Sequence, residues 1–277
     1  MTRTPLLRGV YLPPFGPFGD PKVLVELAVR AEAAGWDGVF LWDHVVSNAA
    51  PIADCWTSLS AMATETRTIR IGPTVTPLPR RRPWIVARQA STVSRLSGGR
   101  VIVGVGLGSD ESGDFSRFGE ENDVRVRSSM LGEALDVMRS MWAGTPHAHS
   151  GEHYRVDIPA GTPEPFPIPL WMASSTRHAR VIERAASCDG IFPISDHTLR
   201  PEELESIVDR LRRGGVSRDR RYDVAVSGNA SPAWERPNPD GVDLAAMADA
   251  GATWWMESLI HFDPIELSLR VVDAGPP

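Results

Sequence analysis

The chain has 277 residues, of which 42% are hydrophobic and 23% are charged, and this composition is ordinary for a globular protein with a full hydrophobic core. Its net charge of −6 argues against a nucleic-acid binder, which needs a basic face, and its two cysteines argue against a disulfide framework and favour a reducing cytoplasm. The N-terminus lacks the apolar run of a signal peptide, and no stretch approaches the roughly twenty apolar residues of a membrane span, so we expect a cytoplasmic protein that does not enter a membrane.

Hydrophobic patterning, punctuated by glycine and proline, predicts eight strands that are each followed by a helix. The strands are apolar and rich in β-branched residues, which is typical of a parallel sheet buried on both faces. In chain order, the predicted strand and helix pairs are 8–15 and 21–34, 38–43 and 54–66, 69–76 and 83–96, 101–106 and 124–141, 169–173 and 177–186, 190–194 and 201–212, 222–227 and 243–250, and 252–258 and 264–272.

Eight such units predict that residues 1–277 form one domain, a (β/α)8 TIM barrel of the α/β class. The third helix should end at Gly98-Gly99, because glycine adopts a positive φ without a steric clash. A doubly wound open sheet is the alternative architecture, because local periodicity does not reveal whether a sheet closes on itself.

Two segments do not follow the repeating pattern. Residues 109–122 are polar and predict a long loop at a ligand-facing position. Residues 145–168 contain a turn at 151–154 and then several prolines, which predict a short hairpin and a stiff connector inserted between the fourth helix and the fifth strand. The arginines at 80–82 are interpreted as a solvated loop, with an anion contact at the barrel mouth as the alternative.

The strand ends that lead into helices are where ligands bind in such barrels. His44 follows an apolar strand and adjoins Asp43, so its imidazole either transfers a proton near neutral pH or forms a structural hydrogen bond. Polar residues at the other strand ends are Thr74, Thr76, Ser109, Ser195, Asp196, His197, Ser227, Asn229, Glu257 and Ser258. This set is rich in hydroxyls and poor in metal ligands, which favours a polar cofactor over metal-dependent hydrolysis.

Ser174, Ser175 and Thr176 precede the fifth helix, where hydroxyls and free amides either bind an anion or cap the helix. Gly104, Gly106 and Gly108 match the dinucleotide fingerprint only loosely. They indicate instead that the backbone passes close beneath a flat ligand.

Two further groups of side chains have a structural interpretation. The spacing of His147, His149 and His153 matches no standard metal site, so no metal is expected. Four aromatic residues either line a partly apolar pocket or pack in the core: Trp42, Trp84, Phe115 and Phe118.

Segments along essentially the whole chain carry a resemblance to a known family: residues 31–44, 82–108, 118–120, 127–144, 151–154, 185–192 and 251–255. In order and spacing they resemble the bacterial luciferase-like family of flavin-dependent oxidoreductases. The resemblance implies a (β/α)8 barrel that binds FMN, or in one branch the deazaflavin F420, at its mouth.

The resemblance also implies roles for individual residues. His44 matches a histidine tied to proton transfer or substrate contact, and Thr74-Val75 matches a bulge beneath the isoalloxazine where a non-proline cis peptide is expected. Ser174, Ser175 and Thr176 fall where the FMN branch holds the phosphate. The predicted catalytic residue is His44, and the predicted cofactor-binding residues are Asp43, Thr74, Val75, Gly106, Ser174, Ser175 and Thr176.

The choice of cofactor depends on two opposing features. Ser109 stands where some F420 enzymes have a glutamate, which favours FMN, whereas the Trp42-Asp43-His44 ending and the many arginines favour F420 with its acidic tail.

The leading hypothesis is a monooxygenase that uses O2 and reduced FMN from a separate flavin reductase on an unidentified small organic substrate. The alternatives are an F420-dependent oxidoreductase that transfers hydride without O2 and a non-catalytic flavin-binding barrel. A homodimer formed through the second and third helices is expected from the same resemblance.

Overall fold

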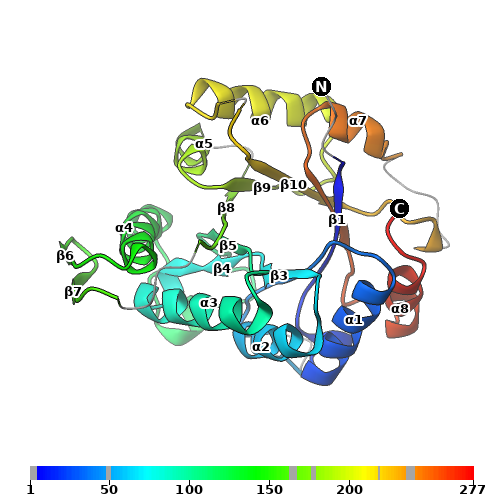
Figure 1. Ribbon diagram of the computed structural model, residues 1–277, viewed down its shortest axis with the longest axis horizontal. Helices are drawn as coiled ribbons and strands as arrows, with labels where there is room; N and C mark the ends of the chain where they lie inside the picture. Colours follow the sequence, from blue (N-terminus) through cyan, green and yellow to red (C-terminus); the bar gives the residue numbers. More distant parts are fainter. Residues whose placement is uncertain (1–4, 48–50, 162–166, 176–178, 218, 235–240) are drawn as a thin grey trace.

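The computed structural model describes residues 5–47, 51–161, 167–175, 179–217, 219–234 and 241–277. Within these ranges a ring of strands is surrounded by helices (Figure 1). The ring strands are β1 (Leu7–Leu12), β2 (Gly38–Leu41), β3 (Arg70–Pro73), β4 (Thr76–Pro77), β5 (Val103–Gly106), β8 (Leu170–Ser175), β9 (Gly190–Ile194), β10 (Asp223–Gly228) and β11 (Trp254–Ser258).

The α-helices are α1 (Pro21–Ala33), α2 (Cys55–Glu65), α3 (Pro83–Ser97), α4 (Val124–Ala143), α5 (Ala179–Ala186), α6 (Pro201–Arg213), α7 (Leu244–Asp249) and α8 (Ile265–Asp273). Short 3₁₀ helices are η1 (Gly16–Phe18), η2 (Leu78–Arg80), η3 (Ser116–Phe118) and η4 (Pro232–Trp234). No helix in the described ranges has the length and apolar character needed to cross a bilayer.

The ring strands are all parallel and follow the order β3-β2-β1-β11-β10-β9-β8-β5-β4. The two ends of this sheet meet, because the Ile71 amide donates to the Arg100 carbonyl at 3.2 Å and the Ile102 amide donates to the Ile71 carbonyl at 3.0 Å. Strands β3 and β4 are two halves of the predicted third strand. The predicted (β/α)8 barrel is therefore confirmed, and the open-sheet alternative is wrong.

Closure of the ring depends on two glycines where β3 and β5 approach each other, Gly72 and Gly104. A methyl group on Gly72 would overlap the carbonyl of Ile102. A methyl group on Gly104 would lie 2.8 Å from the carbonyl oxygen of Pro73. Because carbon and oxygen atoms do not approach this closely without repulsion, only glycine lets these two strands lie side by side.

The helix ends follow the expected local chemistry. Aspartate side chains cap the N-termini of four helices by accepting backbone amide hydrogen bonds, namely Asp20, Asp54, Asp123 and Asp243. Helix α3 ends at Gly98, which has φ of 67°, and the Gly99 amide donates to Ser94 at 2.8 Å. The predicted stop at Gly98-Gly99 is confirmed.

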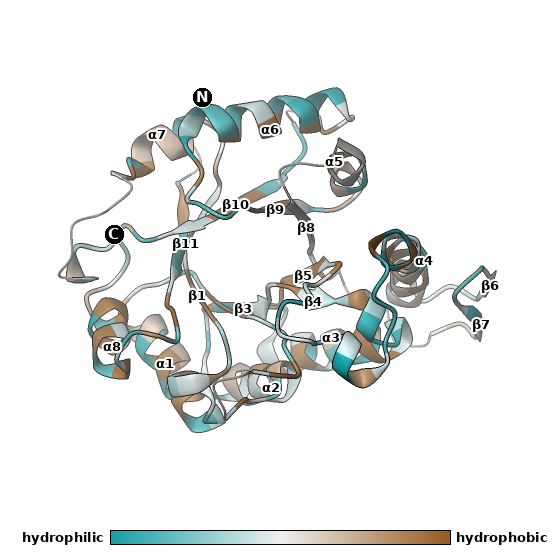
Figure 2. Cartoon of the chain, turned by 180° about the vertical axis from the view of Figure 1, so that it is seen from behind, coloured by the Kyte–Doolittle hydropathy of each residue, from teal (hydrophilic) through white to brown (hydrophobic). Residues whose placement is uncertain are grey.

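The inside of the ring is filled by aromatic side chains rather than left open. Phe40 stacks on Trp171 with ring centres 5.3 Å apart, and Trp254 packs against both rings at 5.5 Å. A second, larger core lies between the ring and the surrounding helices. Figure 2 shows that the helices combine apolar and polar faces, as this two-layer packing requires. These three rings, of Phe40, Trp171 and Trp254, form an aromatic plug that closes the barrel below its mouth.

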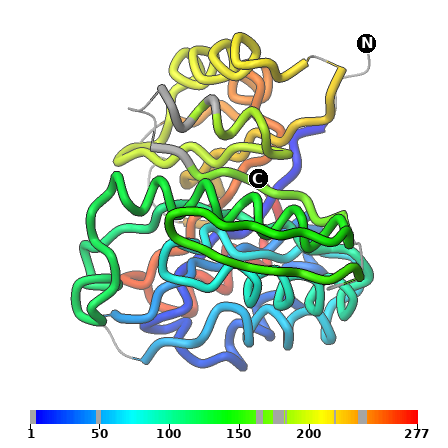
Figure 3. The backbone as a smooth tube through the Cα atoms, turned by 90° about the vertical axis from the view of Figure 1, so that its left-hand side faces the viewer, coloured from blue at the N-terminus to red at the C-terminus, as the bar shows by residue number. Residues whose placement is uncertain are grey.

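The predicted hairpin is present as β6 (His147–Ser150) and β7 (Arg155–Ile158), which pair antiparallel. It lies outside the ring, beyond α4 (Figures 1 and 3). Glu133 on α4 holds its turn by accepting hydrogen bonds from the amides of Glu152 and Tyr154 and by pairing with His149 at 3.0 Å. Burial opposes ionisation of Glu133, but these bonds outweigh it and lower its pKa to about 2. Residues 162–166 of the predicted connector lie outside the described ranges.

Glu32 performs a similar role near the base of the barrel. From α1 its carboxylate accepts the amides of Arg67, Thr68 and Ile69, at 2.6–2.9 Å for the shorter bond in each case, where the chain turns into β3. Partial burial opposes ionisation, but the backbone donors prevail and lower the pKa of Glu32 to about 2. The carboxylate therefore stabilises the fold in its charged form.

We predict that Glu32→Gln lowers the free energy of unfolding by about 1–2 kcal/mol at pH 7, since charge-assisted bonds to amides are lost. The folded-state pKa lies below the unfolded value of about 4.3, so the contribution is complete above about pH 5 and disappears as the pH falls toward 2. Denaturant titrations across this pH range measure it. Glu26→Gln, on an exposed residue of the same helix, is the control and should change stability by less than about 0.5 kcal/mol. A Glu32→Gln effect that does not depend on pH would contradict the assignment.

Candidate active site

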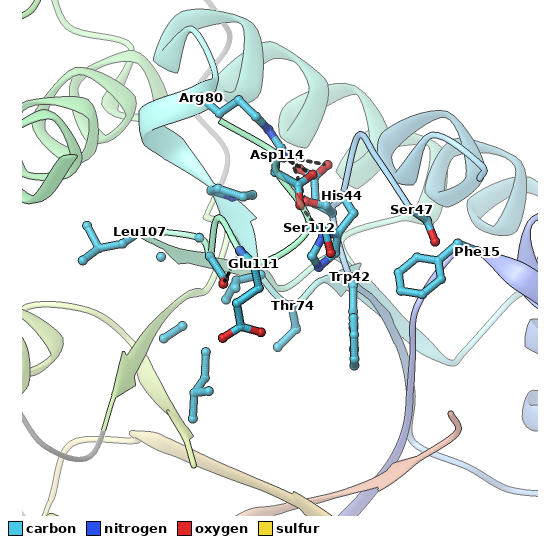
Figure 4. A pocket seen from close by; sticks show the side chains of 18 of the residues that line it. Phe15, Trp42, His44, Ser47, Thr74, Arg80, Leu107, Glu111, Ser112 and Asp114 are labelled. Atoms are coloured by element: carbon cyan, nitrogen blue, oxygen red, sulfur yellow. Dashed lines mark hydrogen bonds and ion pairs between the residues drawn. The ribbon is translucent and has the colours of Figure 1, made fainter. Parts of the chain in front are cut away.

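A pocket of about 760 Å³ opens at the carboxyl ends of the ring strands. This is the end at which TIM barrels bind ligands, and the volume is typical of a small-molecule site. Figure 4 shows part of its lining. The described residues that line it are Tyr11, Phe15, Trp42, Asp43, His44, Ser47, Thr74, Val75, Pro77, Arg80, Gly106, Leu107, Gly108, Ser109, Glu111, Ser112, Asp114, Ala173, Ile194, His261 and Phe262.

His44 lies directly after β2, and its side chain is held by an acidic partner. Its Nδ1 is 2.7 Å from an oxygen of Asp114, which comes from the loop after β5. A carboxylate at Nδ1 orients the ring and leaves Nε2 as the nitrogen that can exchange a proton with a ligand. The His44 side chain is 26% exposed, so a ligand in the pocket can reach it.

Asp114 is almost fully buried and has several partners. Its second oxygen accepts the Val45 amide at 2.7 Å and an Arg80 Nη1 hydrogen bond at 2.8 Å. Burial alone would raise the pKa of Asp114, but the hydrogen bonds from His44 and Val45 and the charge of Arg80 lower it below its ordinary value. Asp114 is therefore a fixed negative charge behind His44.

Arg80 and Arg81 are held by buried carboxylates rather than by solvent. The Arg81 guanidinium makes a two-point contact with the buried Asp43 carboxylate at 2.5 and 2.7 Å, and Arg80 bridges the Asp43 carbonyl and Asp114. The Arg80 side chain is only 5% exposed. Burial tends to lower the pKa of Arg81, but Asp43 raises it above its ordinary value. The predicted solvated loop is wrong for Arg80 and Arg81, because two buried carboxylates require cationic partners; Arg82 is exposed.

Thr74 and Val75 lie where the predicted third strand breaks into β3 and β4. The peptide bond between them is cis, as the resemblance predicts. Val75, Gly106 and Ala173 form a floor of small and aliphatic groups, and a methyl group on Gly106 would lie 3.2 Å from the Ala173 Cβ and 3.6 Å from Val75. The floor is therefore flat at Gly106.

Two polar atoms of the lining have no partner among the described residues. They are the buried hydroxyl of Thr74 and the buried indole nitrogen of Trp42. A buried donor without a partner is costly, but both atoms are covered by protein, so they do not show which ligand the pocket takes. A flat ring system, such as that of a flavin or deazaflavin, fits this floor.

The predicted phosphate site is only partly described. Ser174 and Ser175 end β8, next to Ala173 of the pocket floor, and pair in register with Pro193 and Ile194 of β9. Thr176 lies outside the described residues. The phosphate-binding role of the three residues stays a prediction.

The pocket thus brings together His44, Asp43, Thr74, Val75 and Gly106, all of which were predicted from the sequence. It also contains Asp114 and Glu111, which were not predicted individually. Both come from the polar segment 109–122, whose ligand-facing position was the available signal. Glu111 stands two residues after Ser109, and its side chain extends away from Asp114 on the side of Leu107 and Thr74 (Figure 4).

Other candidate residues lie outside the pocket lining. His197 is half exposed, with partners Asp196 and Glu203. Glu257 is fully buried and ties the loop after β10 to β11 by accepting hydrogen bonds from the amides of Ala230 and Ser231 and from the indoles of Trp234 and Trp255. These are structural interactions.

Of the four aromatic residues considered, only Trp42 lines the pocket in the described structure. Phe115 is buried beneath Arg80 and Arg127, Trp84 packs on Tyr154, and Phe118 is 57% exposed.

Several curated proteins are similar to this chain. An F420-dependent glucose-6-phosphate dehydrogenase from Segniliparus rotundus is 31% identical over 77% of this chain and 67% of its own length. One from Rhodococcus hoagii is 27% identical over 92% of this chain and 86% of its own length. The match to the enzyme from Amycolatopsis mediterranei, at 34% identity, covers about half of that protein, 48%.

Solved structures share the fold at lower sequence identity. An F420-dependent secondary alcohol dehydrogenase in complex with an F420-acetone adduct has a TM-score of 0.79 at 19% identity and 97% coverage of both chains. The oxygenating constituent of 3,6-diketocamphane monooxygenase from Pseudomonas putida, in complex with FMN, has a TM-score of 0.72 at 16% identity, covering 97% of this chain and 96% of its own. Residues 9–248 match the family described as luciferase-like monooxygenase. The chain therefore belongs to the luciferase-like monooxygenase family.

Proposed function

We propose that the protein is an F420-dependent oxidoreductase that transfers hydride between the deazaflavin and a small organic substrate without using O2. The observation that carries the proposal is the His44–Asp114 pair beside a pocket floor that is flat at Gly106. The choice of F420 over FMN is supported by the relatives, since proteins matching 77% and 92% of this chain are F420-dependent dehydrogenases.

The cofactor would lie across the floor of the pocket. Val75 and Gly106 offer it a flat surface. When bound, F420 supplies the two-electron hydride chemistry. The protein positions the substrate, limits the access of water to the pocket and transfers one proton.

His44 would accept and donate that proton at Nε2. It takes the proton when an alcohol is oxidised and returns it when a carbonyl is reduced. Asp114 keeps the ring oriented through its contact with Nδ1, and its lowered pKa keeps this carboxylate ionised in the folded protein. Arg80 forms a buried ion pair with Asp114, and this ion pair fixes the position of the carboxylate that contacts His44.

A monooxygenase that uses reduced FMN and a separate reductase is the second candidate. It is favoured by Ser109, which stands where some F420 enzymes have a glutamate, and by the shared fold with an FMN-containing oxygenating protein. The two candidates differ in cofactor affinity and in their need for oxygen.

We predict that the purified protein binds F420 with at least about tenfold higher affinity than FMN, and that F420 turnover is the same in air and under nitrogen. Quenching of cofactor fluorescence measures binding, and the absorbance of oxidised F420 measures turnover. Binding of FMN but not F420, with O2 consumed when the FMN is reduced, would favour the second candidate instead.

We predict that His44→Asn lowers kcat by about 10²–10³-fold, the range expected for loss of a general acid–base group, while the affinity for F420 stays within about threefold. Stopped-flow reduction of bound F420 separates the two quantities. His197→Asn replaces a histidine outside the pocket lining and serves as the matched control. If His44→Asn turned over at the normal rate, His44 would not be the proton-transfer group.

A further inference from the structure

The pocket lacks an available cation among the described residues that line it. Arg80 is the only arginine or lysine in that lining, and it is committed to Asp114 and to the Asp43 carbonyl, with 5% of its side chain exposed. Three carboxylates, those of Asp43, Glu111 and Asp114, belong to the same lining. Burial lowers the pKa of His261 and so opposes a positive charge on this imidazole.

The side of the pocket around His44 is aromatic. Phe15 follows β1, Trp42 and His44 follow β2, and His261 and Phe262 follow β11; we call these five residues the aromatic wall. Phe15 is at its centre, with ring centres 6.0 Å from Trp42, 5.8 Å from His44 and 4.7 Å from His261. The wall joins three segments that are distant in sequence.

Phe262 ends the wall at the mouth of the pocket. Its ring centre is 3.9 Å from that of His261, and the residue is 83% exposed. An exposed phenylalanine in a pocket lining offers apolar surface that a bound molecule can cover. Ile194, 45% exposed, adds a second exposed apolar side chain to the lining.

From this geometry, and resting on the proposed function, we propose that the substrate is an uncharged, largely apolar alcohol or the corresponding aldehyde or ketone. Its hydrocarbon part lies against the aromatic wall, and its oxygen lies at Nε2 of His44. The site discriminates against sugar phosphates, in contrast to the activity named for the relatives.

The discrimination has an electrostatic cause. A phosphate dianion that enters a protein pocket loses hydration and needs cationic or amide donors in exchange. The described lining offers the Glu111 carboxylate, whereas its one arginine, Arg80, is already paired with Asp43 and Asp114. An uncharged alcohol has no such cost and gains from contact with the aromatic rings.

The reaction balances with the groups already named. The alcohol's C–H bond breaks with its electron pair, which passes as hydride to F420, while the O–H proton passes to His44 and a C=O double bond forms. The alcohol is oxidised and F420 is reduced, and the proton leaves His44 for solvent. Reduction of a ketone or aldehyde runs the same transfers in reverse.

The test compares cyclohexanol with glucose 6-phosphate on the F420-loaded protein. Calorimetry measures the affinity for each compound, and the absorbance of F420 measures kcat/KM. We expect cyclohexanol to bind at least about tenfold more tightly than glucose 6-phosphate and to reduce F420 faster. Equal or tighter binding of glucose 6-phosphate would overturn the inference but leave the F420 proposal intact, whereas failure to bind F420 would refute the proposed function itself.

Two variants test whether Phe262 contributes to recognition of the substrate. Phe262→Ser, at an exposed position that should not affect folding, should lower kcat/KM for cyclohexanol about fivefold and for the smaller propan-2-ol less than about twofold. Phe118→Ser, also an exposed phenylalanine but outside the lining, is the matched control and should change neither. An equal effect of Phe262→Ser and Phe118→Ser would overturn the role of the wall.

Glu111→Gln tests the electrostatic cause of the discrimination against sugar phosphates. It should raise the affinity for glucose 6-phosphate relative to cyclohexanol about threefold, because one like charge is removed from the pocket. An unchanged ratio would show that Glu111 does not contribute to the discrimination.

Discussion

The site depends on one buried arrangement of charge, in which Arg80 and Arg81 neutralise Asp43 and Asp114. Each carboxylate would be unfavourable alone in this environment, and removing one partner of a buried pair typically costs about 3–5 kcal/mol. The arrangement links three parts of the chain: the end of β2, the segment around η2, and the loop after β5. His44 is positioned by this arrangement because Asp114 is its partner. The same buried ion pairs therefore hold the loops of the pocket together and position His44.

The barrel beneath provides a rigid base for this arrangement. The ring closes at Gly72 and Gly104, where two strands approach too closely for any side chain, and Phe40, Trp171 and Trp254 fill its interior. The pocket consequently has a floor, and only its mouth is open to ligands. The groups at the mouth that we propose as catalytic lie at strand ends, and the aromatic plug and the contact between β3 and β5 hold these ends in place.

Most of the fold could be predicted from the sequence, because apolar runs and glycine stops such as Gly98 are local signals. The site was predictable only in part. His44 is recognisable because it follows an apolar strand, whereas Asp114 lies in a polar loop without periodicity and meets His44 across 70 residues. The prediction that Arg80 and Arg81 are solvated was wrong for the same reason. Charged side chains in a loop are usually solvated, and only the three-dimensional structure shows that distant carboxylates lie next to these two. The break between β3 and β4 was expected from family resemblance and has no signature in hydrophobic patterning.

Phe262 has a thermodynamic consequence for ligand recognition. In the free protein, water surrounds most of this ring, and ordered hydration of apolar surface carries a high heat capacity. A ligand that covers the ring releases that water, so the binding enthalpy should become more negative as the temperature rises. The temperature coefficient of the enthalpy thereby reports how far the bound molecule reaches toward the rim, without any structure of the complex.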